Sequence, residues 1–542
     1  MDHETRLKEI LAEAAKKIGI EVKAEEIVID HAKEKAHGDF STNLAMRYAK
    51  LLHKAPRDIA QEIVDSISDP MIEKIEIAGP GFINFFLKQE SLASIIATVI
   101  EQGSEYGRAP RNGKKLCLEY VSANPTGDLH LGHTRCAAVG DSLAKILDAA
   151  GFDVTKEFYV NDCGNQVEHL GHSLRARYHA LFGEPLDLAE DDYHGEDLIA
   201  IAQKIKDEFG DKYLTDSPQS HDFFIHFGIE EELAKLKKDL ADFGVIFDKF
   251  SYESDIRKGG NVEKTLVELR EKGYVYEQEG AQYLKTTAFL DDKDRPVVKS
   301  NGLYTYFMPD ICYHYNKMSR GFDLLIDVLG ADHHGYLNRM KSALMMKGYS
   351  PEVLDFVLVQ VVRVYRDGQE VKMSKRTGKA IAHRDLVEEV GRDAVRYFFV
   401  ERNQSTHLDF NYNLATEQSS NNPVYYAQYA HARCCSILEL GKDFAIDVSA
   451  PLLKEESELS ILKHLSDFPS MIVSSAETRS PNRVAAYIHR LAELFHEFYG
   501  KCRVVDPNNK ALTESRLALI KSVKITMENA LALLGVSAPT KM

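Results

Sequence analysis

One stretch, Leu116 to Gly151, constrains the fold of this 542-residue chain more than any other. It opens with a mostly apolar run, Leu116 to Val121, that suits a buried parallel strand. A turn rich in helix-breaking residues follows at Ser122–Gly127, and apolar residues then recur at helical spacing until Gly151 ends the helix. A strand, a turn and a helix in this order place the helix N-terminus at the carboxyl edge of a parallel sheet, where nucleotides bind.

The motif His130-Leu131-Gly132-His133 stands where that helix begins. Its two histidines, three residues apart, lie on one face of a helix, and Gly132 lets a flat adenine ring approach the backbone closely. Two imidazoles and free backbone N–H groups would suit a nucleotide phosphate. The alternative is that the histidines cap the helix, and the motif alone leaves both interpretations open. It is not a zinc signature, because the glutamate and the spacing of H-E-x-x-H are absent.

A second motif, Lys372-Met373-Ser374-Lys375-Arg376, lies between Gly368 and Gly378 and follows an apolar, strand-like run from Phe356 to Tyr365. Three cations on a loop with flanking glycines can close over a polyphosphate. Alone, this motif favours the simpler interpretation of a solvated basic turn. In this order and on this topology, the two motifs resemble the HIGH and KMSKS signatures of class I aminoacyl-tRNA synthetases.

The composition is that of an ordinary globular protein, with 44% hydrophobic and 28% charged residues, and the length predicts three or four domains. No apolar run approaches the roughly 20 residues that span a bilayer, and the charged N-terminus is not a secretory signal. We therefore expect a cytoplasmic protein without a membrane partner.

The seven cysteines show neither C-x-x-C spacing nor a disulfide framework, so no structural zinc is expected. A net charge of −16 argues against indiscriminate nucleic-acid binding and against a DNA partner, although a local basic groove stays compatible with it.

Residues 1 to about 110 predict a small α+β domain. Helices are expected near Glu4–Lys17, Thr42–His53 and Pro56–Ile67, and strands at Ile72–Ala78 and Phe82–Leu87. Exposed phenylalanines here could stack on unpaired bases, although most of those at positions 40, 82, 85 and 86 are expected to fill a small core. The segments HGDFSTNLAM at 37–46 and GPGFINFFL at 79–87 resemble the N-terminal domain of arginyl-tRNA synthetases. This resemblance implies contact with the D-loop at the tRNA elbow, with Phe82 and Asn84 as candidate residues.

Residues from about 111 to 410 predict a Rossmann-like α/β domain with a parallel sheet and an insertion from about 175 to 295. A second strand is expected at Val154–Val160, and the sheet resumes at Leu324–Leu329. The latter strand runs into Gly330-Ala331-Asp332-His333-His334. The carboxyl end of a parallel strand suits ligand contact, so Gly330, Asp332 and His334 are candidate binding residues.

Residues from about 411 to 542 predict an all-α bundle, with apolar stripes in helices near His489–Phe498 and Ser515–Leu534. Tyr425, Tyr429 and Arg433 have the chemistry to stack on bases, but the composition is equally consistent with tyrosines that pack the bundle. The run from Asn422 to Arg433 resembles the anticodon-binding bundle of arginyl-tRNA synthetases.

The candidate amino-acid pocket combines two acids from separate segments. Glu119 and Ser122 lie on or just after the first strand, with Asn124 in the turn, and Tyr306 and Asp310 lie in YTYFMPDICYH at 304–314. A planar guanidinium needs a planar array of acceptors, and a carboxylate can bind it in a bidentate fork. Singly, either acid is better explained as a salt bridge or a cap.

Together, E-x-x-S-x-N and Y-x-x-x-D resemble the arginine pocket of arginyl-tRNA synthetases, with Tyr306 expected to close over the bound side chain. The segment NDCGNQ at 161–166 matches the N-D-x-G-x-Q of that family. Gly127 stands where members with a degenerate KMSKS loop carry a compensating lysine, so the chain resembles the bacterial type.

The resemblance covers essentially the whole chain and implies an arginine–tRNA ligase. Such an enzyme uses ATP with Mg²⁺ to form arginyl-adenylate from L-arginine and then charges the 3′ end of tRNA(Arg). It implies that His130 and His133 stabilise the transition-state phosphate, and that Lys372 and Lys375 hold the β- and γ-phosphates. Further ATP contacts are expected from Gly132, Met373 and Ser374, and adenosine contacts from Gly330, Asp332 and His334.

Other functions stay open at this point. They are a class I synthetase for lysine or cysteine, a simpler nucleotidyltransferase of the same superfamily, and a catalytically silent RNA-binding paralogue. The absence of a cysteine–histidine set near the site disfavours the cysteine enzyme. The RNA-type flanking domains disfavour the simpler nucleotidyltransferase, and the intact motifs disfavour the silent paralogue. A monomer is expected, although the sequence does not define the oligomeric state or the residues that read the tRNA.

Overall fold

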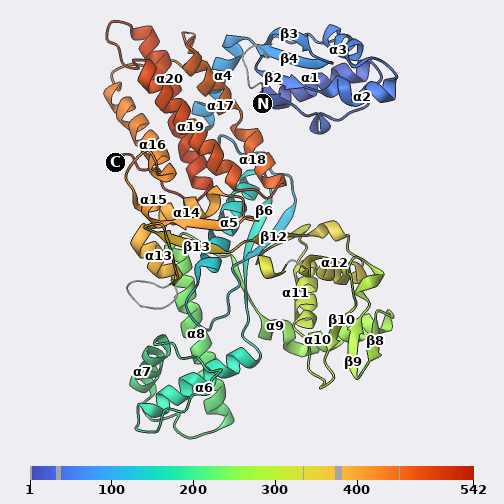
Figure 1. Cartoon of the computed structure of the whole chain (residues 1–542), viewed down its shortest axis with the longest axis vertical. Helices are drawn as coiled ribbons and strands as arrows, with labels where there is room; N and C mark the ends of the chain where they lie inside the picture. The colour runs from blue at the N-terminus through green and yellow to red at the C-terminus, as the bar shows by residue number, and fades with distance from the viewer. Residues whose placement is uncertain (1–2, 32–37, 334, 373–380, 451) are drawn as a thin grey trace. The chain divides into compact units, whose positions relative to one another are not determined.

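The computed structural model describes residues 3–31, 38–333, 335–372, 381–450 and 452–542. These residues form two compact units (Figure 1). The terminal unit combines residues 1–110 with residues 417–542, and the central unit comprises residues 111–416.

A five-stranded parallel sheet forms the centre of the central unit, in the strand order β12-β11-β5-β6-β7. Its strands are β5 (Lys115–Tyr120), β6 (Asp153–Val160), β7 (Lys249–Tyr252), β11 (Leu324–Gly330) and β12 (Leu354–Val359). The strands predicted at 116–121, 154–160 and 324–329 are thus present, each within one or two residues. The strand order reverses between β5 and β11, and ligands bind at such a switch point in open α/β sheets.

Helices cover both faces of this sheet. Helix α5 (Leu131–Ala149) packs on β5, β6 and β11. Its Gly140 makes this close approach possible, because a Cβ at position 140 would stand 2.4 Å from the ring of Tyr120. On the opposite face, helices α11 (Phe307–Ser319) and α12 (Tyr336–Lys347) share a core with Cys117 and Leu325, which are register partners on β5 and β11.

The apolar run predicted as one strand from Phe356 to Tyr365 is two strands in different sheets. The sheet strand β12 ends at Val359, and β13 (Val362–Arg366) belongs to a separate sheet with β14 (Gln369–Val371) and β15 (Leu408–Asn411). The break falls at Gln360, whose carbonyl accepts a hydrogen bond of 2.9 Å from Arg135 Nη1. Apolar periodicity cannot separate two consecutive strands, which explains the error. Helices α13 (His383–Val390), α14 (Arg392–Glu401) and α15 (Tyr412–Thr416) complete this region.

The range predicted as a single insertion, 175–295, contains a strand of the main sheet. Before β7, helices α6 (Asn165–Ala180), α7 (Asp197–Phe209) and α8 (Pro218–Asp242) pack around their own apolar core. After β7 come α9 (Glu253–Arg257), α10 (Asn261–Glu271) and an antiparallel sheet of β8 (Val275–Gln278), β9 (Ala281–Leu284) and β10 (Arg295–Val298). Figure 1 shows the two groups as separate lobes. The four residues of β7 are too few to stand out as a strand in the sequence.

In the terminal unit, an antiparallel sheet has the order β1-β2-β4-β3 and lies with three helices. The elements are α1 (His3–Lys17), β1 (Asp30–His31), β2 (Phe40–Thr42), α2 (Leu44–Leu52), α3 (Pro56–Asp65), β3 (Ile72–Ala78) and β4 (Phe82–Leu87). The bundle contains α4 (Gln89–Gln102), α16 (Pro423–Leu440), α17 (Glu456–Ser466), α18 (Phe468–Glu477), α19 (Asn482–Lys501) and α20 (Lys510–Leu533).

Helix α4 packs on α17 and α20, and the hydroxyl of Tyr106 donates to the carbonyl of Leu465. The bundle therefore includes residues from both ends of the chain. Among the described helices, none is long and apolar enough to cross a membrane.

Candidate functional site

The first motif lies at the N-terminus of α5, where His130 is the capping residue. Its Nδ1 atom accepts hydrogen bonds from the backbone N–H groups of Gly132 at 3.1 Å and His133 at 3.3 Å. The capping alternative is therefore present in the structure, and these two N–H groups are not free for a phosphate, contrary to the sequence expectation. Gly132 is required here, because a Cβ at this position would lie 2.9 Å from the His130 ring.

These hydrogen bonds use Nδ1 of each histidine and leave Nε2 to interact with a ligand. The rings of His130 and His133 stack with centroids 3.6 Å apart, and His133 Nδ1 accepts from the His130 backbone N–H at 3.4 Å. Burial lowers the pKa of His130, and burial with the neighbouring His130 and His383 lowers the pKa of His133 to about 3. Both rings are therefore neutral at pH 7. Because Nδ1 accepts in each ring, Nε2 carries the proton and can donate it to a ligand.

The candidate arginine residues gather where β5 ends. Val121 and Ser122 have φ angles of 69° and 41°, a strained conformation for residues with side chains. The turn brings the Ser122 hydroxyl back to Glu119, so that it donates to Oε1 at 2.8 Å and accepts from the Tyr159 N–H at 3.1 Å. In the following turn, Asn124 Nδ2 donates to Gln166 Oε1 at 2.7 Å.

The sequence analysis missed the residues that connect the two acids. Lys317 Nζ donates to Glu119 Oε2 at 2.5 Å and to Asp327 Oδ1 at 2.8 Å. Asp327 Oδ2 bonds to His314 Nε2 at 2.9 Å, and His314 Nδ1 bonds to the backbone carbonyl of Asp310 at 2.8 Å. A signal was present, because Asp310, His314 and Lys317 recur at positions i, i+4 and i+7 on one face of α11.

Asp310 is held by Tyr336 rather than by Tyr306. The Tyr336 hydroxyl donates to Asp310 Oδ2. Burial, with the charges of Glu119 and Glu253, raises the pKa of Asp310 to about 6 against the opposing effect of this hydrogen bond. Tyr306 is 75% exposed, so the structure does not place it over the two acids as the sequence predicted.

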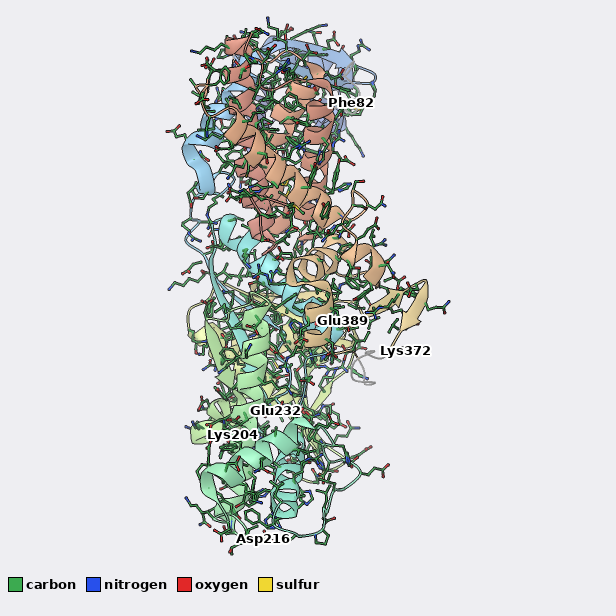
Figure 2. The ribbon with its side chains drawn as sticks, turned by 90° about the vertical axis from the view of Figure 1, so that its left-hand side faces the viewer. Phe82, Lys204, Asp216, Glu232, Lys372 and Glu389 are labelled. Atoms are coloured by element: carbon green, nitrogen blue, oxygen red, sulfur yellow. The ribbon has the colours of Figure 1, made fainter. Side chains whose placement is uncertain are left out.

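Two of the residues predicted to bind the nucleotide, Gly330 and Asp332, lie at the carboxyl end of β11. Gly330 ends this strand, and Asp332 follows with its carboxylate exposed to solvent, 3.7 Å from His333. Lys372 lies directly after β14 with its side chain exposed (Figure 2). His334, Met373, Ser374 and Lys375 lie outside the described residues.

The candidate RNA residues of the terminal unit differ in exposure. Phe82 is 38% exposed (Figure 2), whereas Asn84 is only 3% exposed and accepts a hydrogen bond from Ser41 at 2.7 Å. Asn84 is therefore not accessible in this structure. On α16, the rings of Tyr425 and Tyr429 are parallel within 8°, and the Arg433 guanidinium lies 5.8 Å from the Tyr429 ring. Of the four phenylalanines considered, those at 40 and 85 are buried in the core, as expected.

Across the described ranges, no three His, Cys, Asp or Glu side chains are arranged to hold a metal ion. Each of the seven cysteines is a free thiol.

Comparison with known proteins gives one consistent family. Residues 95–436 match the family described as tRNA synthetases class I (R), catalytic domain, residues 5–87 match the arginyl tRNA synthetase N terminal domain, and residues 427–542 match the DALR anticodon binding domain. The chain is 48% identical to the arginine–tRNA ligase of Bacillus subtilis over 99% of this chain and 98% of that protein. It is also 48% identical to the arginine–tRNA ligase of Shouchella clausii over the full length of both chains.

The fold has a match among solved structures. The arginyl-tRNA synthetase of Thermus thermophilus superposes with a TM-score of 0.80 and 23% identity, over 100% of both chains, which supports the fold alone. The catalytic-domain match over residues 95–436 and the full-length relatives establish the family. The chain belongs to the arginyl-tRNA synthetases, a family of class I aminoacyl-tRNA synthetases.

Proposed function

We propose that the carboxyl edge of the central sheet is where this chain, an arginine–tRNA ligase, activates L-arginine with ATP and charges tRNA(Arg). The observation that carries this assignment is the pair of buried acids, Glu119 held by Lys317 and Ser122, and Asp310 held by Tyr336. A site that holds two acids in fixed positions suits a planar cation better than it suits a neutral amino acid.

The reaction has two steps. A carboxylate oxygen of arginine attacks the α-phosphorus of ATP, the bond to the bridging oxygen of the β-phosphate breaks, and pyrophosphate leaves. A hydroxyl of the terminal ribose of tRNA then attacks the arginyl carbonyl, and AMP leaves. The protein forms no covalent bond in either step, so catalysis rests on positioning and on stabilisation of charge.

On the phosphate side, we assign transition-state stabilisation to His130 and His133 through their Nε2–H groups. Because burial keeps both rings neutral, positive charge comes from Lys372 and Lys375, which we assign to the β- and γ-phosphates. Further ATP contacts are assigned to Gly132, Met373, Ser374, Gly330, Asp332 and His334. Mg²⁺ arrives bound to ATP and would neutralise phosphate charge, and no protein ligand is assigned to it.

On the arginine side, we assign the guanidinium to Glu119 and Asp310. Ser122 orients Glu119 through its hydrogen bond, and Asn124 faces the same turn. Tyr306 can serve as a lid only if its exposed ring turns toward the two acids when arginine binds.

For tRNA(Arg), we assign the D-loop contact to Phe82 and the anticodon contact to Tyr425, Tyr429 and Arg433. The exposed ring of Phe82 and the parallel tyrosines on α16 support stacking on bases. We further propose that the protein works as a cytoplasmic monomer without structural zinc.

The test is amino-acid-dependent exchange of pyrophosphate into ATP, measured with each of the twenty amino acids, with and without tRNA(Arg). Of the twenty amino acids, only arginine should support exchange, and exchange should need bound tRNA, as the resemblance to the family implies. Exchange with lysine or cysteine at a comparable rate, or none with any amino acid, would refute the assignment. Glu119→Gln should abolish most arginine-dependent exchange, and unchanged KM for arginine in this variant would remove Glu119 from the pocket.

A further inference from the structure

Three buried carboxylates stand side by side across the parallel sheet. Glu119 on β5 is the register partner of Asp327 on β11 and of Glu157 on β6. All three residues are at most 8% exposed. Three adjacent buried negative charges are unstable without nearby cations, because burial disfavours each charged form and the charges repel one another. We call these three residues the acid row.

Helix α11 and the residue that caps its C-terminus supply two cations to the acid row, Lys317 and Arg320. Lys317, whose side chain is 0% exposed, contacts Glu119 and Asp327 at 2.5 and 2.8 Å. Arg320 Nη2 contacts Glu157 Oε1 and Oε2 at 3.0 and 2.8 Å. Lys317 is shared between Glu119 and Asp327, and Asp327 also contacts His314. Among the described contacts, the shared ammonium is therefore the one charged partner of Glu119.

The contacts also fix the orientation of Glu119. Its Oε2 is bound by Lys317 and its Oε1 by Ser122. Each carboxylate oxygen can accept more than one hydrogen bond, so Oε1 keeps acceptor capacity at the switch point. Burial lowers the pKa of Lys317, but the charges of Asp327 and Glu119 outweigh this effect and hold the pKa above its ordinary value. Lys317 is therefore charged at neutral pH and is a fixed part of the site.

We propose that Lys317 is a positioning residue for arginine recognition: it holds Glu119 in place and favours its charged form, and because its own charge is shared with Asp327, Glu119 keeps the capacity to pair with the substrate guanidinium. The inference rests on the proposed role of Glu119 in arginine binding. Lys317 itself does not touch the substrate in this account. It acts through Glu119, so its loss should impair arginine binding rather than the chemical step.

Removal of Lys317 gives this proposal a distinctive pH signature. Without the ammonium, Glu119 and Asp327 face each other buried and uncompensated, which disfavours the doubly ionised form of the pair. The titratable and charged groups that surround the pair are Asp310, Tyr313 and His314 on α11, Arg320 directly after it, Cys117 on β5, Glu157 and Tyr159 on β6, Glu253 on α9, and Tyr336 on α12. None of the cations among them contacts Glu119 in the described structure, so none replaces Lys317.

The experiment compares Lys317→Met with Lys317→Arg in tRNA-dependent pyrophosphate exchange by the full chain between pH 7 and pH 9. Lys317→Met should raise KM for arginine at pH 7 by about tenfold or more. The increase should shrink as pH rises and the pair of Glu119 and Asp327 becomes fully ionised, while kcat and KM for ATP stay within about threefold of wild type. Lys317→Arg keeps the positive charge and should stay within about threefold of wild-type KM for arginine.

A purely structural role predicts a different result, namely a smaller active fraction with an unchanged and pH-independent KM for arginine. That result, or a KM increase that is equal at pH 7 and pH 9, would overturn the proposal. If Lys317→Met does not fold, the double variant Lys317→Gln with Asp327→Asn removes one charge of each sign and carries the same prediction. The Glu119→Gln variant distinguishes failure of the proposed arginine pocket from failure of this inference. A normal KM for arginine in Glu119→Gln refutes the pocket itself. A raised KM for arginine in Glu119→Gln, together with a normal KM in Lys317→Met, refutes only the role of Lys317.

Discussion

The two sides of the candidate site are constructed on different physical principles. On the arginine side, buried groups are linked from Glu119 through Lys317 and Asp327 to His314, and the Asp310 carboxylate is held separately by Tyr336. On the phosphate side, the two histidines are stacked and neutral, and the described cation Lys372 is exposed. One side presents a fixed negative field before any ligand binds, whereas the other offers hydrogen-bond donors and takes its positive charge from the lysines assigned to the phosphates.

This difference suits the two tasks. Selection of one amino acid requires a pocket that leaves buried charges unpaired when the wrong substrate enters. Stabilisation of a phosphoryl transition state requires groups that interact more strongly with the transition state than with the substrate. Damage to the arginine side should therefore appear in KM for arginine and in specificity, and damage to the phosphate side should appear in kcat.

The largest effect is expected for Asp310→Asn, which removes a charge from the arginine side and keeps the shape. Loss of one member of a buried charge pair costs about 2–5 kcal/mol, so kcat/KM for arginine should fall by roughly 30- to 4,000-fold. Pyrophosphate exchange measures this directly. Tyr336→Phe is the matched control, because it removes only the hydrogen bond to Asp310, and it should cost about tenfold or less. A decrease below threefold for Asp310→Asn would exclude the carboxylate from arginine binding.

Lys375→Ala should test the phosphate side with a somewhat smaller effect. This residue lies outside the described structure, and its role rests on the sequence motif. Loss of one cationic partner in the transition state should cost about 2.7–4 kcal/mol in kcat, while KM for arginine stays within about threefold. Lys204→Ala, on the helical lobe (Figure 2), is the control and should behave as wild type. Exchange by Lys375→Ala at nearly the wild-type rate would contradict the division of tasks.

Deletion of residues 1–87 leaves both sides of the site intact and should weaken only the binding of tRNA. We place the cut before α4, because that helix packs on the bundle. Loss of a stacked base costs about 1–3 kcal/mol, so KM for tRNA should rise roughly 5- to 150-fold, with KM for arginine unchanged at saturating tRNA. Phe82→Ala in the full chain is the companion variant. Unchanged KM for tRNA in both proteins would argue against the elbow contact.

The smallest effect is the pH dependence of the wild-type protein. Because the pKa of Asp310 is raised by burial to about 6, this carboxyl is ionised above that pH and protonated below it. A guanidinium binds the ionised form, so kcat/KM for arginine should fall as pH drops through about 6. Above that pH, Asp310 should contribute no further pH dependence. Asp310→Asn should remove that inflection. An inflection that persists in the variant belongs to another group.

The sequence analysis predicted much of the fold, for reasons that lie in local patterns, whereas the roles of the phosphate-side residues stay predictions. The strand before Val121 is a short apolar run, the helix after His130 has a periodicity of 3.6, and Gly151 marks the end of that helix. The boundary at Gln360 and the short strand β7 were missed, because both depend on which strand pairs with which. Pairing is a tertiary property that a local pattern does not contain.

The arginine side was predicted as the acids Glu119 and Asp310 with Ser122, Asn124 and Tyr306, but without Lys317, His314 and Asp327. Lys317 was missed, because a lysine in a charged helix is ordinarily exposed. Its burial follows from the register that puts Glu119 beside Asp327. Tyr306 and Asn84 were predicted as contact residues by resemblance, but a motif does not state whether a side chain is exposed, buried or already bonded.

The central claim is that arginine is selected in one step by a preset charged pocket. Its most direct test is the ratio of kcat/KM for arginine to that for lysine, measured by pyrophosphate exchange with tRNA(Arg) present. Lysine brings a point charge instead of a planar fork and leaves one acid poorly matched. The account predicts a ratio of about 10⁴ or more for the wild-type protein, and a much smaller ratio for Asp310→Asn. A wild-type ratio below about 10², or a ratio that Asp310→Asn leaves unchanged, would contradict it.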